Sequence, residues 1–94
     1  MLVIQYVDGR ARPVITCDYC HRAIDDARNG NYQWQAAGQA IQFTHKRCCR
    51  AFEQSRGGDW CASELTCLPV YLGNNLDLDW ERAIANAQLL ATLS

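Results

Sequence analysis

Four residues of this chain have the types and the spacing of a metal-binding site. Two residues separate Cys17 from Cys20, and two residues separate His45 from Cys48 further along the chain. Two such pairs of soft or borderline ligands are typical of tetrahedral zinc sites. The sequence therefore predicts one zinc ion held by three cysteines and one histidine.

The spacing has a physical reason in each pair. Two intervening residues allow a tight turn to point both side chains at one ion, while backbone N–H groups face the sulfurs. In the second pair, Thr44 is predicted to cap a helix that begins at His45, which places His45 and Cys48 one turn apart on the same face. A shell of four protein ligands has no open position, so the predicted zinc ion is structural.

Two neighbouring residues are alternative ligands. Cys49 could replace Cys48, although it would point about 100 degrees round the helix from it. His21 could replace His45, although a surface histidine is the simpler interpretation of its place directly after the first pair. The spacing favours Cys48 and His45.

The six cysteines could instead form three disulfides of a secreted domain. Residues 1–7 lack the basic region and the length of a secretory leader, and we expect the protein in a reducing cytoplasm. Cys61 and Cys67 have no second pair to complete another site, and they are interpreted as buried apolar thiols.

Composition and patterning predict an α+β fold in a single domain of 94 residues, 49% of them hydrophobic. Residues 1–56 are predicted to form the zinc-binding module and residues 57–94 a helical extension. A hairpin turns at Asp8 and Gly9, and a loop with one helical turn covers residues 21–31. A second hairpin turns around Gly38 and leads into the helix at 45–56.

The second hairpin supplies the predicted core. Tyr32, Trp34 and Phe43 alternate with polar residues, and this aromatic face is expected to pack on the zinc helix through Ala51 and Phe52. Stacking of the same rings on nucleic-acid bases is the alternative interpretation. In a domain this small, a role in the core is favoured.

The segment after residue 56 is predicted to be a turn at Gly57 and Gly58 followed by helices. Ser63 would cap a short helix interrupted by Pro69 and ended by residues 73–75. A final helix would start at a cap supplied by Asp77 or Asp79, with Leu76 or Leu78 packing on its first turn. Its apolar positions are Trp80, Ala83, Ile84, Ala87 and Leu90, widened by Leu89 and Leu93. That face would cover the zinc module or meet another chain, including a second copy.

The order of a cysteine knuckle, a loop, a hairpin and a helix that supplies the last two ligands resembles the treble-clef class of zinc fingers, over roughly residues 15–56. The pattern of Cys17, Cys20, His45 and Cys48 is similar to the first zinc module of LIM domains. The chain departs from LIM domains because residues 57–94 offer only two cysteines for a second module. The resemblance implies metal binding, and treble clefs serve nucleic-acid binders, ribosomal proteins, interaction modules and nucleases alike.

Charge is unevenly distributed. Residues 1–56 hold eight of the nine basic side chains and five of the ten acids, whereas residues 57–94 hold one base and five acids. The basic side chains on the helix at 45–56 could contact phosphates or could simply lie on its solvated face. They are Lys46, Arg47, Arg50 and Arg56. The start of the final helix carries acidic residues, whereas the recognition helix of a helix-turn-helix protein contacts DNA through its N-terminal residues. DNA recognition by this helix is therefore not expected.

These observations predict a zinc-stabilised binding or adaptor protein that recognises a protein partner. The alternative is a nucleic-acid-associated zinc finger that contacts phosphates through the basic helix. An enzyme is not expected, because neither a nucleophile with its base nor a phosphate-binding loop stands out. No stretch approaches the about 20 apolar residues of a membrane span.

Overall fold

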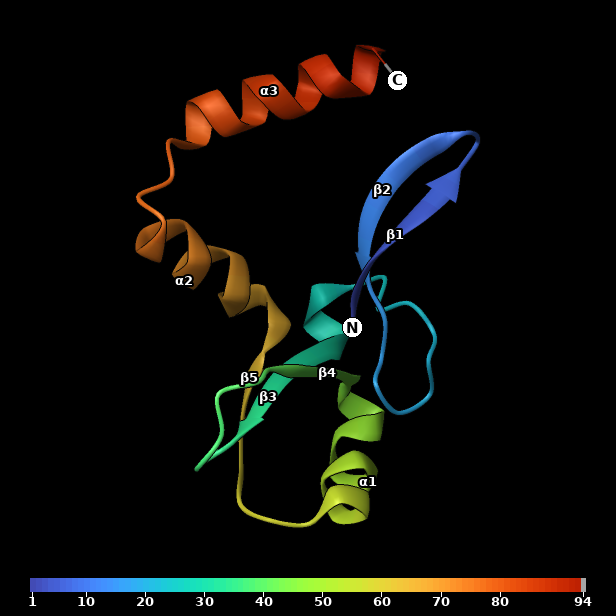
Figure 1. The fold of residues 1–94 in the computed structure, drawn as a ribbon, viewed down its shortest axis with the longest axis vertical. Coiled ribbons are helices and arrows are strands. Elements are labelled where there is room, and N and C mark those ends of the chain that lie inside the picture. The colour runs from blue at the N-terminus through green and yellow to red at the C-terminus, as the bar shows by residue number, and fades with distance from the viewer. Residues whose placement is uncertain (94) are drawn as a thin grey trace.

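The structure is a computed structural model that describes residues 1–93, with side chains through residue 90. Strands β1 (Leu2–Val7) and β2 (Arg10–Ile15) form an antiparallel hairpin, which rises away from the rest of the molecule (Figure 1). Asp8 and Gly9 make the turn with φ values of 53° and 79°. Positive φ at both positions suits the right-handed twist of a hairpin, and the prediction of this hairpin is confirmed.

A three-stranded antiparallel sheet lies at the centre, in the order β4-β3-β5. Its strands are β3 (Gly30–Gln35), β4 (Gln42–His45) and β5 (Trp60–Glu64). The hairpin of β3 and β4 was predicted, but β5 was missed and Ser63 lies in this strand instead of capping a helix. Gly57 and Gly58, with φ of 71° and 90°, reverse the chain so that it returns along β3.

Helix α1 (Lys46–Arg56) packs on one face of this sheet, and it is not the face that the sequence predicted. The ring of Phe52 meets the ring of Trp60 edge to face, with 5.4 Å between centroids. Trp60 pairs with Gln35, and residues paired across strands share a face, so α1 lies over the side that carries Gln33 and Gln35. The expectation that the aromatic face would pack on α1 through Ala51 and Phe52 was therefore wrong.

The aromatic residues of the second hairpin are covered to different extents. Tyr32 is buried, and it stacks on the half-buried Trp34 with 5.6 Å between ring centroids. Phe43 is also half-buried. The predicted core role thus holds fully for Tyr32 alone.

The remaining elements are two 3₁₀ turns and two further helices. The turns are η1 (Ala27–Asn29) and η2 (Leu65–Cys67), and the helices are α2 (Leu68–Asn75) and α3 (Trp80–Leu93). Pro69 lies in the first turn of α2, where its missing N–H costs nothing, so it does not kink the helix. Asp79 caps α3 as predicted, because its Oδ1 accepts a hydrogen bond of 3.1 Å from the backbone N–H of Arg82.

The resulting fold is α+β, as predicted, with a small core. The buried apolar side chains are Cys17, Tyr32, Cys48, Phe52 and Leu65. Cys61 and Cys67 are exposed, so their prediction as buried thiols was wrong. The predicted role of Leu93 lies outside the described side chains. Among residues 1–93, no helix has both the length and the apolar content that crossing a membrane requires.

Candidate metal centre

The fold brings the four candidate ligands together. Cys17 and Cys20 lie in the loop after β2, His45 ends β4, and Cys48 lies in the first turn of α1. One ligand atom of each residue lies within 4.8 Å of those of the other three. All six cysteines of the chain are free thiols, so the structure does not support the disulfide alternative. These four residues could hold one metal ion.

A tight backbone turn sets the positions of the first two sulfurs. The N–H of His21 donates to the carbonyl of Cys17 at 2.9 Å, and the N–H of Cys17 donates to the carbonyl of Arg22 at 2.8 Å. His21 closes this turn with a φ of 64°, while its side chain is exposed. His21 therefore shapes the knuckle through its backbone, and its imidazole is not part of the cluster.

Three backbone N–H groups point at the sulfur of Cys17. Those of Tyr19, Cys20 and His45 each lie 3.4 Å from it. Burial by itself raises the pKa of Cys17, but the three N–H groups stabilise its thiolate and bring the pKa from 9.0 down to about 6. This residue is thus prepared as an anionic ligand by the backbone around it.

The imidazole of His45 is held in the orientation that a ligand needs. Its Nε2 lies 3.2 Å from the carbonyl oxygen of Ala23. Because a carbonyl only accepts, Nε2 carries the proton and donates, which leaves the lone pair of Nδ1 for a metal. Nδ1 lies 3.3 Å from the sulfur of Cys20, close to the roughly 3.5 Å between two atoms bound tetrahedrally to one zinc ion.

Asp18 links the turn between Cys17 and Cys20, the knuckle, to strand β4, a role that sequence reasoning missed. Its Oδ2 accepts from the N–H of Phe43 at 2.8 Å, and its own N–H donates to the carbonyl of Phe43 at 2.7 Å. Phe43 is two residues before His45, so this pair of bonds sets the distance between the two halves of the cluster. An acid between the two cysteines was the only signal of it in the sequence.

Cys48, and not its neighbour Cys49, lies in the cluster. Cys48 is buried beside Cys17, whereas the sulfur of Cys49 faces Glu53 one turn along α1 at 3.9 Å. Burial, together with the negative charge of Cys17, raises the pKa of Cys48 to about 11. A metal cation bound among the sulfurs would place a positive charge beside Cys48 and so favour its thiolate form.

The predicted cap of α1 was wrong. His45 is the N-cap residue and makes no side-chain capping hydrogen bond. Thr44 is buried in β4, where its hydroxyl donates to Oε1 of Gln33 at 2.6 Å and is not available to the helix. Helix α1 instead starts directly after His45, which is both the last residue of β4 and one of the four candidate ligands.

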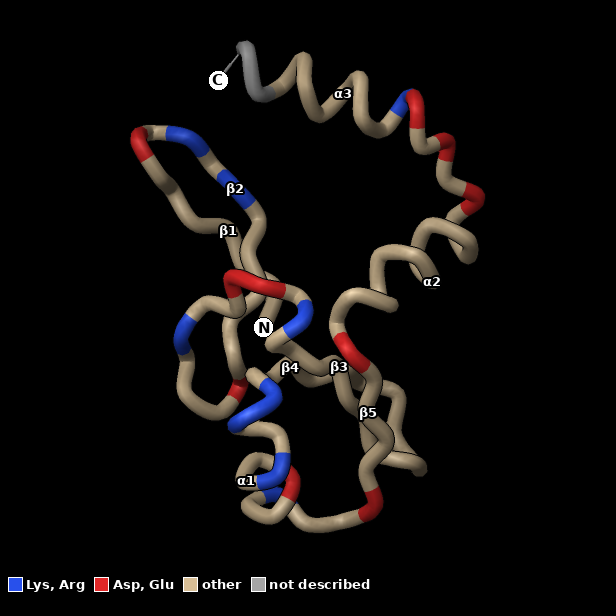
Figure 2. Tube along the Cα trace, turned by 180° about the vertical axis from the view of Figure 1, so that it is seen from behind, with Lys and Arg blue, Asp and Glu red and all other residues tan. Residues whose placement is uncertain are grey.

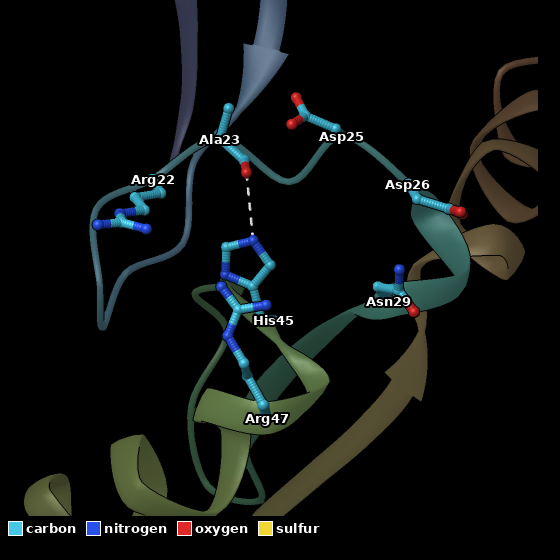
Figure 3. A pocket seen from close by; sticks show the side chains of 7 residues that line it. All are labelled: Arg22, Ala23, Asp25, Asp26, Asn29, His45 and Arg47. Atoms are coloured by element: carbon cyan, nitrogen blue, oxygen red, sulfur yellow. Dashed lines mark hydrogen bonds between the residues drawn. The ribbon is translucent and has the colours of Figure 1, made fainter.

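An open pocket of about 350 Å³ lies beside the centre (Figure 3). Its lining consists of Arg22, Ala23, Asp25, Asp26, Asn29, His45 and Arg47. His45 is the one candidate ligand in this lining, and its Nε2 is directed to Ala23 (Figure 3). The carboxylate of Asp26 is occupied by Arg28, whose guanidinium holds the pKa of Asp26 at about 2. The pocket thus reaches the outer side of the imidazole and not the sulfurs.

Comparison with known proteins adds no family to this description. No protein-family model, no curated protein and no solved structure matches the chain. The geometry of the described residues is therefore what any functional assignment depends on.

Proposed function

We propose that the protein binds one structural zinc ion through Cys17, Cys20, His45 and Cys48. The observation that carries this proposal is the convergence of three sulfurs and one imidazole nitrogen within 4.8 Å. Three thiolates select zinc or iron over calcium and magnesium, which prefer oxygen ligands. Four ligands fill a tetrahedral shell and leave no open position, so the ion stabilises the fold and does not act on a substrate.

The order of the elements around the cluster supports the treble-clef resemblance. A knuckle supplies two ligands, the hairpin of β3 and β4 follows, and the last two ligands lie at the junction of β4 and α1. In this arrangement the ion joins the loop after β2 to the sheet and the helix. We expect the metal to be worth much of the folding free energy, since the buried apolar core is small.

Metal analysis of the purified chain tests the site. We expect one zinc per chain, and X-ray absorption should give three sulfurs at about 2.3 Å and one nitrogen at about 2.0 Å from the ion. Iron in place of zinc would contradict the metal assignment but not the ligand set. Protein that is fully folded and free of metal would contradict the proposal itself.

On this scaffold we infer a binding or adaptor role. Exposed apolar side chains lie on the hairpin of β1 and β2 and on α2 and α3, including Leu2, Ile4, Tyr6, Val70, Tyr71 and Ile84. Exposed apolar surface of this extent is typical of proteins that meet a partner. The test is recovery of protein partners on zinc-loaded bait after nuclease treatment. Proteins that are recovered without nuclease and lost on nuclease treatment would contradict this role.

Nucleic-acid binding is the second candidate, favoured by the basic residues along α1 (Figure 2). Arg47 and Arg50 are exposed there, whereas Lys46 is paired with Glu64 and the guanidinium of Arg56 lies 5.1 Å from the ring centre of Phe52. If this helix contacts phosphates, affinity for generic RNA or DNA falls steeply with salt. Lack of any binding at low salt would remove this candidate.

A further inference from the structure

The hairpin of β1 and β2 presents a continuous apolar face to solvent. Strand register pairs Leu2 with Ile15, Ile4 with Pro13, and Tyr6 with Ala11. Paired residues share a face, so these six side chains form one surface, which we call the hairpin face. Ile4 is 57% exposed and Tyr6 76% exposed, so the rest of the chain leaves this surface largely open.

Helix α3 carries a second apolar surface. Trp80, Ala83, Ile84 and Ala87 follow at intervals of three and four residues, and we call them the helix stripe. Ile84 is 55% exposed and Trp80 is 48% exposed. Trp80 touches α2 at Gly73, where an added Cβ would lie 2.5 Å from its ring, but this contact covers only part of the indole.

The total exposed area is too large for a self-contained protein of this size. The chain exposes 7106 Å², whereas a folded monomer of 10.6 kDa is expected to expose about 5,500 Å². Its radius of gyration is 15.1 Å, against about 12 Å for a compact domain of this length. Two copies together carry roughly 3,200 Å² of excess surface, within the range that a stable homodimer buries.

The hairpin face and the helix stripe share a location. Both the hairpin and α3 lie toward the same end of the long axis (Figure 1). Neither arginine of the hairpin lies on the hairpin face: Arg10 pairs with Val7 and Arg12 with Gln5, so both belong to the opposite face of the ribbon. The contact that we infer is therefore apolar, and each chain carries both of the surfaces that it needs.

We propose that two copies of the chain form a symmetric dimer in which the helix stripe of each copy packs on the hairpin face of the other. A two-fold axis makes this contact twice, closes the assembly, and covers both apolar surfaces. The proposal deepens the adaptor role by naming a second copy as partner. It does not depend on which metal occupies the cluster, and failure of the zinc assignment leaves it standing.

Sedimentation of the full zinc-loaded chain tests the dimer directly. We expect twice the 10.6 kDa mass of one chain, with dissociation on dilution. Ile4→Glu on the hairpin and Ile84→Lys on the helix should each raise the dissociation constant by roughly a hundredfold, because each buries an unpaired charge in the contact. Ile41→Glu is the matched control, since Ile41 is also exposed but lies in the loop between β3 and β4.

Mixing the two variants distinguishes this dimer from other pairings. Only if hairpin meets helix does a mixed dimer contain one contact with both original isoleucines and one contact that sets the introduced glutamate against the introduced lysine. Association should then recover at least about tenfold relative to either variant alone. Circular dichroism and zinc content must match the parent in each case, because both isoleucines are exposed in the single chain. A monomer at millimolar concentration, or an unchanged dimer in Ile4→Glu, would overturn the proposal.

Discussion

Thr44 donates a hydrogen bond of 2.6 Å to Gln33 across β3 and β4, beneath helix α1 and one residue before the candidate ligand His45. Both side chains are fully buried, although each is polar. The Nε2 of Gln33 is a buried side-chain nitrogen without a hydrogen-bond partner among the described residues. The strand that presents His45 is therefore held by a polar contact inside the core, and this contact is the one side-chain hydrogen bond that Gln33 makes among the described residues.

Thr44→Val should destabilise the protein by about 1 to 3 kcal/mol, because it leaves Oε1 of Gln33 buried without its donor. The double variant Gln33→Leu with Thr44→Val should recover most of that loss, since it removes both polar groups and keeps the volume. Chemical unfolding of the zinc-loaded protein measures both. A double variant that is less stable than Thr44→Val alone would contradict the role given to this pair.

Cys48→Ser and Cys49→Ser form a matched pair of adjacent substitutions that tests the ligand choice. Cys48→Ser removes one sulfur from the cluster, and zinc should fall well below one per chain with loss of much of the fold. Cys49→Ser changes a thiol that faces Glu53 and should keep full zinc. Metal content with circular dichroism gives the answer, and the reverse pattern would move the fourth ligand to Cys49.

Removal of metal by a chelator should unfold the module around the sheet. Without a cation, Cys48 keeps its proton, because its pKa is raised to about 11, and the buried thiolate of Cys17 has no cation beside it. The loop after β2 then loses its link to α1. We expect the signals of Trp34 and Trp60 to change on chelation and to return on adding zinc. Persistence of the parent near-ultraviolet spectrum in metal-free protein would show that the cluster does not support the fold.

Much of this fold follows from local sequence signals, and the exceptions have a common cause. The turn at Asp8 and Gly9, the cap at Asp79 and the spacing of the cysteines each depend on neighbouring residues, so they could be read directly from the chain. Strand β5 could not, because its pairing with β3 depends on residues about thirty positions away. Thr44 illustrates the same limit: a good capping residue is used instead by Gln33 across the sheet.

Which face of the second hairpin is buried under α1 could not be predicted, for a related reason. Alternation predicted that the aromatic face of the second hairpin packs on α1, but α1 covers the face with Gln33 and Gln35 instead. Phe52 from α1 and Trp60 from β5 close over that face, and neither residue is local to it. Asp18 was missed in the same way, since its two bonds to Phe43 cross from the knuckle to β4.

Phe52→Ala should destabilise the protein by about 3 to 5 kcal/mol, because this ring is only 1% exposed and joins α1 to Trp60. Tyr71→Ala removes a ring that is exposed on α2 and is the matched control, with an expected effect within about 0.5 kcal/mol. Thermal unfolding of zinc-loaded protein compares the two. Equal effects would mean that Phe52 does not hold the helix on the sheet.

Gly73→Ala should loosen the junction between α2 and α3. A Cβ at this position would lie 2.5 Å from the Trp80 ring, closer than atoms can approach, so the indole or the helix must move at a cost of about 1 to 3 kcal/mol. That cost exceeds the roughly 1 kcal/mol gained from alanine in a helix. Hydrogen exchange should therefore become faster along α3, while Gly38→Ala, whose Cβ would meet Gln35 at an ordinary 3.5 Å, should leave it unchanged. If α3 keeps its protection in Gly73→Ala, contacts other than that of Trp80 with Gly73 hold the helix in place.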